Sequence, residues 1–195
     1  MKMRFEEKLK KHKLIGAIKQ PKSLEKAIKY KDNLAAAILM IGNILTVKQY
    51  VDLLHKEGIP VILHLEKIDG LQLDQYGVNF VTDHVKPFAI VTTKPNIIKK
   101  FKAKGMFVIQ RVFLIDTEVF HQLLDKKEHL QPDIIEIMPC RVTDFIEKIA
   151  KESSIPIITG GLLTTTFHAK EALNHGAQAV TTSNSDLWKI GLSKI

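Results

Sequence analysis

The chain has 195 residues, 45% of them apolar, which suffices for one sizeable core and is too little for two ordinary domains. A formal net charge of +8 favours an anionic partner. The single cysteine, Cys140, excludes an internal disulfide, and the eight histidines lack zinc-binding spacing, so we expect neither a metal nor a cofactor. The longest apolar run, Leu34 to Ile41, is far shorter than the roughly 20 residues that cross a bilayer, so we expect a cytoplasmic protein without a membrane segment.

Basic residues are concentrated in two segments. Residues 1–13 contain six lysine or arginine residues and only two acidic ones, and residues 94–104 contain five lysines and no acidic residue. Both segments are candidate nucleic-acid contacts, with solvated helix faces as the alternative. We therefore separate residues 1–13, as a basic N-terminal arm, from residues 14–195, as a single folded domain. The lysines predicted to contact nucleic acid are Lys10, Lys11, Lys13, Lys99, Lys100, Lys102 and Lys104.

Short apolar runs alternate with longer segments of helical period from Leu14 onwards. This alternation is typical of a parallel sheet wrapped by helices. Repeated units of about 24 residues predict a compact single-domain (β/α)8 barrel, with a doubly wound open sheet as the structural alternative. The expected strands are Leu14–Lys19, Ala35–Ile41, Pro60–Leu65, Phe88–Thr93, Met106–Arg111, Asp133–Met138, Pro156–Thr159 and Ala179–Thr182.

Capping residues and glycines mark the helices between these strands. Ser23 is expected to cap the first helix, and Gly58, Gly105 and Gly176 are expected to follow the ends of three others. Residues 67–75 predict a longer loop after the third strand, with Asp69-Gly70 as its turn. This loop would cover or border the functional face.

Polar residues close most of the expected strands, at the end of a parallel barrel where ligands bind. Gly160-Gly161 ends one strand, and Thr181-Thr182-Ser183-Asn184 ends the next. Small and hydroxyl residues let backbone N–H groups approach a phosphate, although tight turns also need small residues. The predicted phosphate-binding residues are Gly160, Gly161, Thr181, Thr182, Ser183, Lys19 and Arg111.

The charged strand ends allow two interpretations. Lys19 and Arg111 would add positive charge to a phosphate site, or would instead form inward salt bridges to Glu66 or Glu136. The two glutamates could transfer protons or could bind the hydroxyl groups of a polyol phosphate. His64 shares a strand face with Glu66, and a hydrogen-bonded histidine is favoured over a metal ligand. We predict hydroxyl binding by His64, Glu66 and Glu136, and no catalytic residue.

Several motifs occur in a fixed order along the chain: Gly70-Leu71, Gln110 to Asp116, Asp133 to Pro139, Thr159-Gly160-Gly161, Gly176 to Asn184, and Leu187-Trp188. Together they resemble the glycerol uptake operon antiterminator family. The resemblance runs from about Leu14 to Trp188. The chain carries Thr164, Glu66 and Cys140 where that family often has Arg, Asp and Gly.

The resemblance implies a bacterial regulator with a compact barrel fold, not an enzyme. Such a protein responds to glycerol 3-phosphate and acts on the leader of a messenger RNA, allowing transcription past a terminator. The effector would stabilise an RNA-competent arrangement of loops or of a homodimer, and the RNA contacts would come from lysines. The alternative is a phosphosugar- or phosphopolyol-metabolising barrel enzyme that uses Glu66 or Glu136 for proton transfer.

Overall fold

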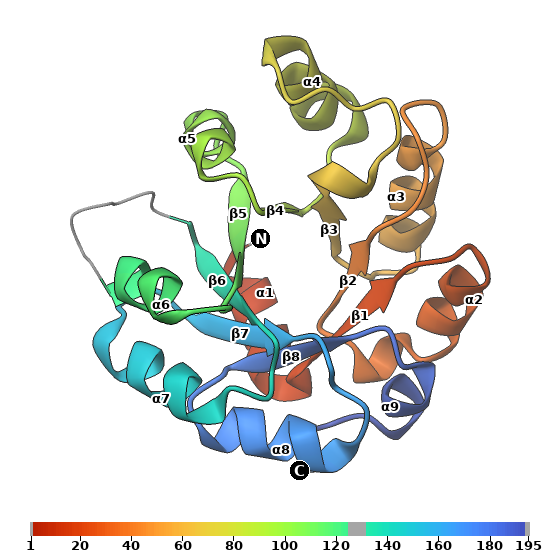
Figure 1. Ribbon diagram of the computed structural model, residues 1–195. Coiled ribbons are helices and arrows are strands. Elements are labelled where there is room, and N and C mark those ends of the chain that lie inside the picture. The colour runs from red at the N-terminus through yellow and green to blue at the C-terminus, as the bar shows by residue number, and fades with distance from the viewer. Residues whose placement is uncertain (1, 125–131, 194–195) are drawn as a thin grey trace.

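The computed structural model describes residues 2–124 and 132–193 and shows a closed barrel of parallel strands (Figure 1). The strands follow one another around the barrel in chain order, and β8 (Ala179–Thr182) pairs with β1 (Leu14–Ile18). The predicted (β/α)8 barrel is therefore confirmed, and an open sheet is excluded because β1 and β8 close the ring. The remaining strands are β2 (Ala36–Leu39), β3 (Val61–His64), β4 (Ala89–Thr92), β5 (Phe107–Phe113), β6 (Ile134–Met138) and β7 (Ile157–Gly160).

Helices cover the outside of the barrel (Figure 1). The α-helices are α1 (Lys2–His12), α2 (Lys22–Lys29), α3 (Val47–Lys56), α4 (Gln75–Asn79), α5 (Pro95–Ala103), α6 (Thr117–Leu124), α7 (Thr143–Glu152), α8 (Thr166–Asn174) and α9 (Ser185–Ile190). Two 3-10 helices, η1 (Lys31–Asn33) and η2 (Leu65–Lys67), and a π-helix, η3 (Phe80–Val85), complete the pattern. None of the helices in these described parts has the length and apolarity needed to span a membrane.

The expected strands all form, but two details of the sequence analysis change. Strand β5 continues past Arg111 to Phe113 and pairs along β6, with Arg111 opposite Glu136. The predicted cap at Ser23 is wrong. Helix α2 starts earlier, after Pro21, whose φ of −55° already suits a helix, and Ser23 is buried within the first turn. Gly58 and Gly105 follow α3 and α5 with positive φ angles, as expected.

The side chains of each strand alternate between two apolar layers. In β1, Ile15 belongs to the cluster inside the barrel, together with Ile38 of β2 and Ile62 of β3. Leu14 and Ile18 belong to the second cluster, between the strands and the helices. Both faces of most strands are therefore buried, which explains why these strands read as continuous apolar runs rather than as alternating patterns.

Helix α1 closes the end of the barrel at which the strands begin. Its Phe5 and Leu9 are each 2% exposed and join the inner cluster. The Phe5 ring lies 4.7 Å from the ring of Phe88 and 5.5 Å from that of Phe107. The segment separated as a basic arm on charge alone thus contributes apolar side chains to the core, while Lys10 and Lys11 of the same helix are exposed.

Candidate functional site

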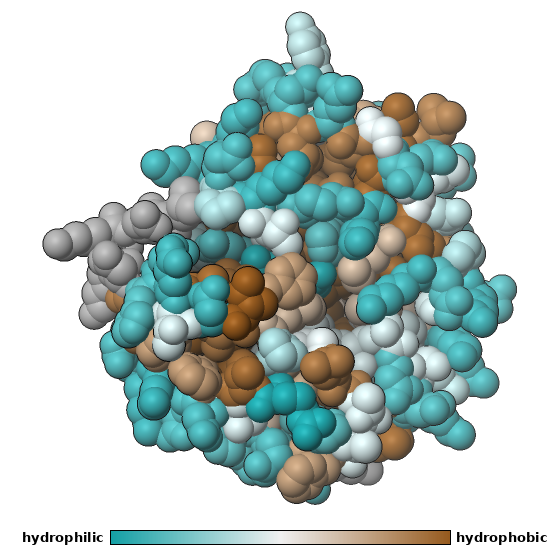
Figure 2. All heavy atoms as spheres, in the orientation of Figure 1, coloured by the Kyte–Doolittle hydropathy of each residue, from teal (hydrophilic) through white to brown (hydrophobic). Residues whose placement is uncertain are grey.

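A pocket of about 440 Å³ lies at the C-terminal ends of the strands. Figure 2 views this end of the barrel and shows a hollow at its centre with hydrophobic side chains beside it. Phe113 and Leu162, 51% and 69% exposed, are two of the apolar residues in the wall. The predicted site residues that line the pocket are Lys19, His64, Glu66, Arg111, Gly161, Thr181, Thr182 and Ser183.

A buried network of three polar side chains lies at the base of this pocket. Arg111 Nε donates a hydrogen bond of 2.7 Å to Glu136 Oε2, and the Thr181 hydroxyl donates one of 2.7 Å to Glu136 Oε1. Glu136 is fully buried, and both carboxylate oxygens are occupied. Glu136 therefore orients Arg111 and Thr181 from behind the wall. It forms the inward salt bridge that the sequence analysis left open, and it does not reach the pocket as a hydroxyl-binding group.

The two neighbouring glycines at the end of β7 have different roles: Gly160 is its last residue, and Gly161 follows it. A methyl group on Gly160 would overlap the Thr181 hydroxyl and lie 2.8 Å from the Thr181 carbonyl oxygen, so this glycine permits the close approach of β7 to β8. Gly161 has a φ of +72°, and a methyl group there would meet nothing closer than Met138 Sδ at 3.6 Å. Gly161 lines the pocket, so it is the glycine that leaves backbone open to a ligand.

Internal hydrogen bonds fix the hydroxyl-rich end of β8. The Thr182 hydroxyl accepts from Asn184 N at 3.1 Å and donates to the carbonyl of Leu163 at 3.4 Å. Trp188 Nε1 donates to the carbonyl of Thr182 at 2.9 Å and anchors the strand end from α9. Ser183 remains exposed at the pocket. Thr181 and Thr182 thus shape the wall, and Ser183 presents the accessible hydroxyl.

His64 and Glu66 face each other across the β3 end of the pocket. His64 Nδ1 lies 3.1 Å from Glu66 Oε2, although the two atoms are not aligned for a hydrogen bond. Glu66 Oε1 accepts from the Thr92 hydroxyl and from the backbone N of Thr93 at 3.0 Å. Burial raises the pKa of Glu66, but nearby His64 and the Thr92 hydroxyl outweigh it and hold the pKa at about 2. Glu66 is therefore an ionised acceptor at neutral pH, suited to hydroxyl donors.

This low pKa predicts acid sensitivity of the fold. The stabilising effect of ionised Glu66 is complete above its ordinary pKa of about 4.5 and is lost as the pH falls towards about 2. From about pH 5 to about pH 2.5, the wild type should lose about 2 kcal/mol more unfolding free energy than Glu66→Gln. Urea unfolding across this range measures the difference. Parallel pH profiles for the two proteins would contradict the ionised, hydrogen-bonded state of Glu66.

The α5-region lysines predicted to contact nucleic acid do not line this pocket. Lys99, Lys100 and Lys104 are exposed on or just after α5. Lys102 Nζ lies 2.8 Å from Asp133 Oδ2 and forms an ion pair with it.

The pocket wall also includes residues that the sequence analysis did not assign to the site. Lys67 and Thr93 follow the ends of β3 and β4, so they could have been found by looking for polar residues just after each expected strand.

Two further observations limit the chemistry of the described residues. No group of three or more His, Cys, Asp or Glu side chains among them could hold a metal ion. Cys140 is buried, and burial raises the pKa of its thiol despite the nearby charge of Arg141. A thiol with a raised pKa is a poor nucleophile, so Cys140 acts as a buried packing residue.

Comparison with known proteins shows close relatives over nearly the whole chain. A family model described as "Glycerol-3-phosphate responsive antiterminator" matches residues 14–188. The crystal structure of a glycerol uptake operon antiterminator regulatory protein from Listeria monocytogenes is 31% identical, with a TM-score of 0.84, and the match covers 90% of this chain and 94% of that one. A glycerol uptake operon antiterminator-related protein from Thermotoga maritima is 25% identical, with a TM-score of 0.79 and coverage of 90% and 97%. The uncharacterized Escherichia coli protein YgcP is 27% identical over 182 residues, or 93% of this chain and 94% of that one.

Proposed function

The chain belongs to the glycerol-3-phosphate responsive antiterminator family, and from this premise we propose that it binds glycerol 3-phosphate in the pocket at the C-terminal strand ends. We further propose that the bound form acts on the leader of messenger RNA from glycerol-utilisation genes. The family match supports the effector and the regulatory role. The polar pocket supports the place of binding.

The distribution of charge around the pocket supports a ligand with two different ends. Gly161, Ser183 and Lys19 directly follow β7, β8 and β1, which are adjacent in the ring. His64 and Glu66 come from the end of β3, on the other side of the ring. A phosphate group would lie against the first group of residues, beside Lys19, and glycerol hydroxyls would donate to Glu66. Arg111, on β5, would contribute its positive charge from the base of the pocket.

A proton-transfer enzyme is less well supported by the same geometry. Glu136 is fully buried and has both oxygens occupied, so it cannot meet a substrate. Glu66 is ionised at neutral pH, which removes it as a general acid, and its low pKa of about 2 makes it a weak general base. The barrel fold alone does not decide between regulation and catalysis. Recognition of a phosphorylated polyol therefore accounts for both glutamates better than proton transfer does.

Calorimetric titration followed by an RNA gel shift tests the proposal. We expect glycerol 3-phosphate to bind saturably, and glycerol and inorganic phosphate to bind much more weakly, because each engages one side of the pocket. Bound effector should tighten binding of a glycerol-operon leader RNA about tenfold, since allosteric couplings are typically about 1–3 kcal/mol. Failure of glycerol 3-phosphate to bind, or binding with no effect on RNA, would overturn the proposed function.

A further inference from the structure

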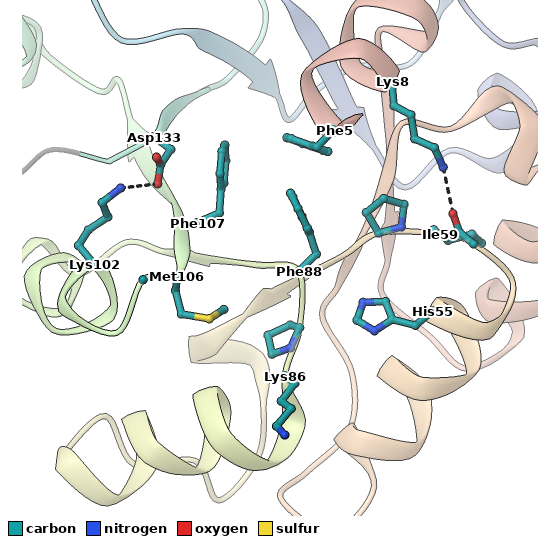
Figure 3. A pocket seen from close by; sticks show the side chains of 14 residues that line it. Phe5, Lys8, His55, Ile59, Lys86, Phe88, Lys102, Met106, Phe107 and Asp133 are labelled. Carbon is teal, nitrogen blue, oxygen red and sulfur yellow. Dashed lines mark hydrogen bonds and ion pairs between the residues drawn. The ribbon is translucent and has the colours of Figure 1, made fainter. Parts of the chain in front are cut away.

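A second pocket, of about 870 Å³, lies at the opposite end of the barrel, where the strands begin. Figure 3 shows that its walls come from segments far apart in the sequence, including α1, the C-terminal part of α3 and the starts of β4 and β5. The proposed effector site uses none of these residues.

The pocket has an apolar, largely aromatic wall. Phe88 and Phe107 are partly exposed, with ring centres 5.7 Å apart and an interplanar angle of 29°. Phe5 packs against both rings from α1. The partly exposed Met106 and the ring of Pro60 extend the apolar surface. Flat rings that remain partly open to solvent offer stacking surface to a planar ligand.

The rim of this pocket is positively charged. Lys8, Lys86 and Lys102 reach it from three different elements. Asp133 is the one acid among the described residues that line it, and its Oδ2 accepts from Lys102 Nζ at 2.8 Å and from Val108 N at 2.9 Å. Because that carboxylate is already neutralised by Lys102, the rim keeps an excess of positive charge.

His55 adds a polar edge to the same pocket. Burial lowers the pKa of His55. Nearby Asp52 raises this pKa by less than burial lowers it, and Lys48 lowers it further. The ring is therefore neutral at pH 7 and offers one nitrogen donor and one nitrogen acceptor. A nucleobase combines flat faces with donor and acceptor edges, which are the features that this wall presents.

The charge around the pocket extends beyond what a small ligand would need. Lys104 directly precedes Gly105, which lines the pocket, and Lys100 lies in the last turn of α5. Lys10 and Lys11 are exposed on α1, at the same end of the barrel. Each of the two basic segments of the sequence thus contributes one lysine, Lys8 or Lys102, to the lining of this pocket. A positively charged surface beside an aromatic pocket suits a polyanion with bases, rather than a single acyl anion.

We propose that this second pocket, with Phe88 in its wall and Lys86 at its rim, binds an unstacked base of single-stranded RNA together with the adjoining phosphate. The inference rests on the proposed function, because it assigns the surface that the RNA occupies. It gives the aromatic wall a role in base stacking and the rim a role in phosphate contact. Single-stranded RNA should therefore bind more tightly than duplex RNA, whose bases stay stacked.

Fluorescence anisotropy with a labelled, mixed-sequence RNA of about 12 nucleotides tests this assignment, in the presence of saturating glycerol 3-phosphate. Phe88→Leu keeps an apolar side chain but removes the flat ring, and Lys86→Glu reverses a rim charge. Phe88→Leu should weaken single-strand binding about tenfold, which is the scale of one stacked base, and Lys86→Glu should weaken it about as much by removing a phosphate contact. The matched controls Phe167→Leu and Lys170→Glu, on α8, should bind RNA like the wild type. Calorimetry should give unchanged glycerol 3-phosphate affinity for all four variants.

The possible failures are distinguishable. Wild-type protein that binds neither effector nor RNA would overturn the proposed function, and the inference with it. If Phe88→Leu and Lys86→Glu both bind RNA as tightly as the wild type does, the inference about the second pocket is wrong, but the proposed function stands. Binding of decanoate that is lost in Phe88→Leu while RNA binding persists would assign the pocket to an acyl anion instead. If Phe88→Leu does not fold, photo-crosslinking of 4-thiouridine RNA to the wild type decides, because crosslinks should fall on residues 86–88 and 105–107.

Discussion

Replacement of Arg111 by Met is expected to lower the free energy of unfolding by about 3–5 kcal/mol, the usual cost of breaking a buried ion pair from one side. Arg111 and Glu136 are both buried, and Arg111 supplies the positive charge that compensates the carboxylate. The Thr181 hydroxyl would remain as a hydrogen-bond donor, but a neutral hydroxyl cannot replace a cation. Urea unfolding at neutral pH measures the loss.

A double variant separates charge from packing. Arg111→Met combined with Glu136→Gln leaves no uncompensated charge, and the Gln carbonyl can still accept from Thr181. We expect the double variant to be more stable than Arg111→Met alone, within about 1–2 kcal/mol of the wild type. It should still bind glycerol 3-phosphate poorly, because the cation at the base of the pocket is gone. A double variant as unstable as the single one would mean that the pair matters through shape rather than charge.

Gly161→Asp is expected to weaken glycerol 3-phosphate binding at least about 100-fold. The new carboxylate would occupy the wall of the pocket and repel the phosphate at close range, where an interaction of several kcal/mol is ordinary. Calorimetric titration measures the change, and thermal unfolding shows whether the variant remains folded.

Gly161→Ala is the matched control, because it carries the same backbone strain without the charge. The φ of +72° costs a non-glycine residue about 1–2 kcal/mol, but the nearest atom to a new methyl group lies 3.6 Å away. We expect Gly161→Ala to bind the effector within about tenfold of the wild type. Retained affinity in Gly161→Asp would show that the phosphate does not lie against this turn.

The sequence predicted the barrel because its physical signals are local. Apolar runs mark the strands, and Gly58 and Gly105 mark helix ends with a φ that other residues avoid. Helix α1 was missed as part of the core because charge was weighed there instead of spacing. Phe5 and Leu9 are four residues apart on one helix face, so that signal was present in the sequence.

The candidate site was only partly predictable, because depth along a strand depends on register. Glu66 and Glu136 looked alike in the sequence, yet Glu66 follows its strand and reaches the pocket, whereas Glu136 lies within β6 opposite Arg111. The different roles of Gly160, which packs against β8, and Gly161, which faces the pocket, could be recognised only from the distance between β7 and β8. The second pocket was beyond sequence reasoning, because segments separated by more than a hundred residues meet there.

Strands β5 and β6 run from one pocket to the other. Phe107 and Asp133 lie at the end near α1, while Arg111 and Glu136 lie beneath the proposed effector. If effector tightens RNA through this shared pair of strands, RNA must tighten effector by the same factor, because linkage is reciprocal. A protein bound to a transcript would then stay occupied by glycerol 3-phosphate at lower concentrations of the metabolite than a free one. Antitermination on a bound transcript would thus persist at metabolite concentrations too low to load free protein.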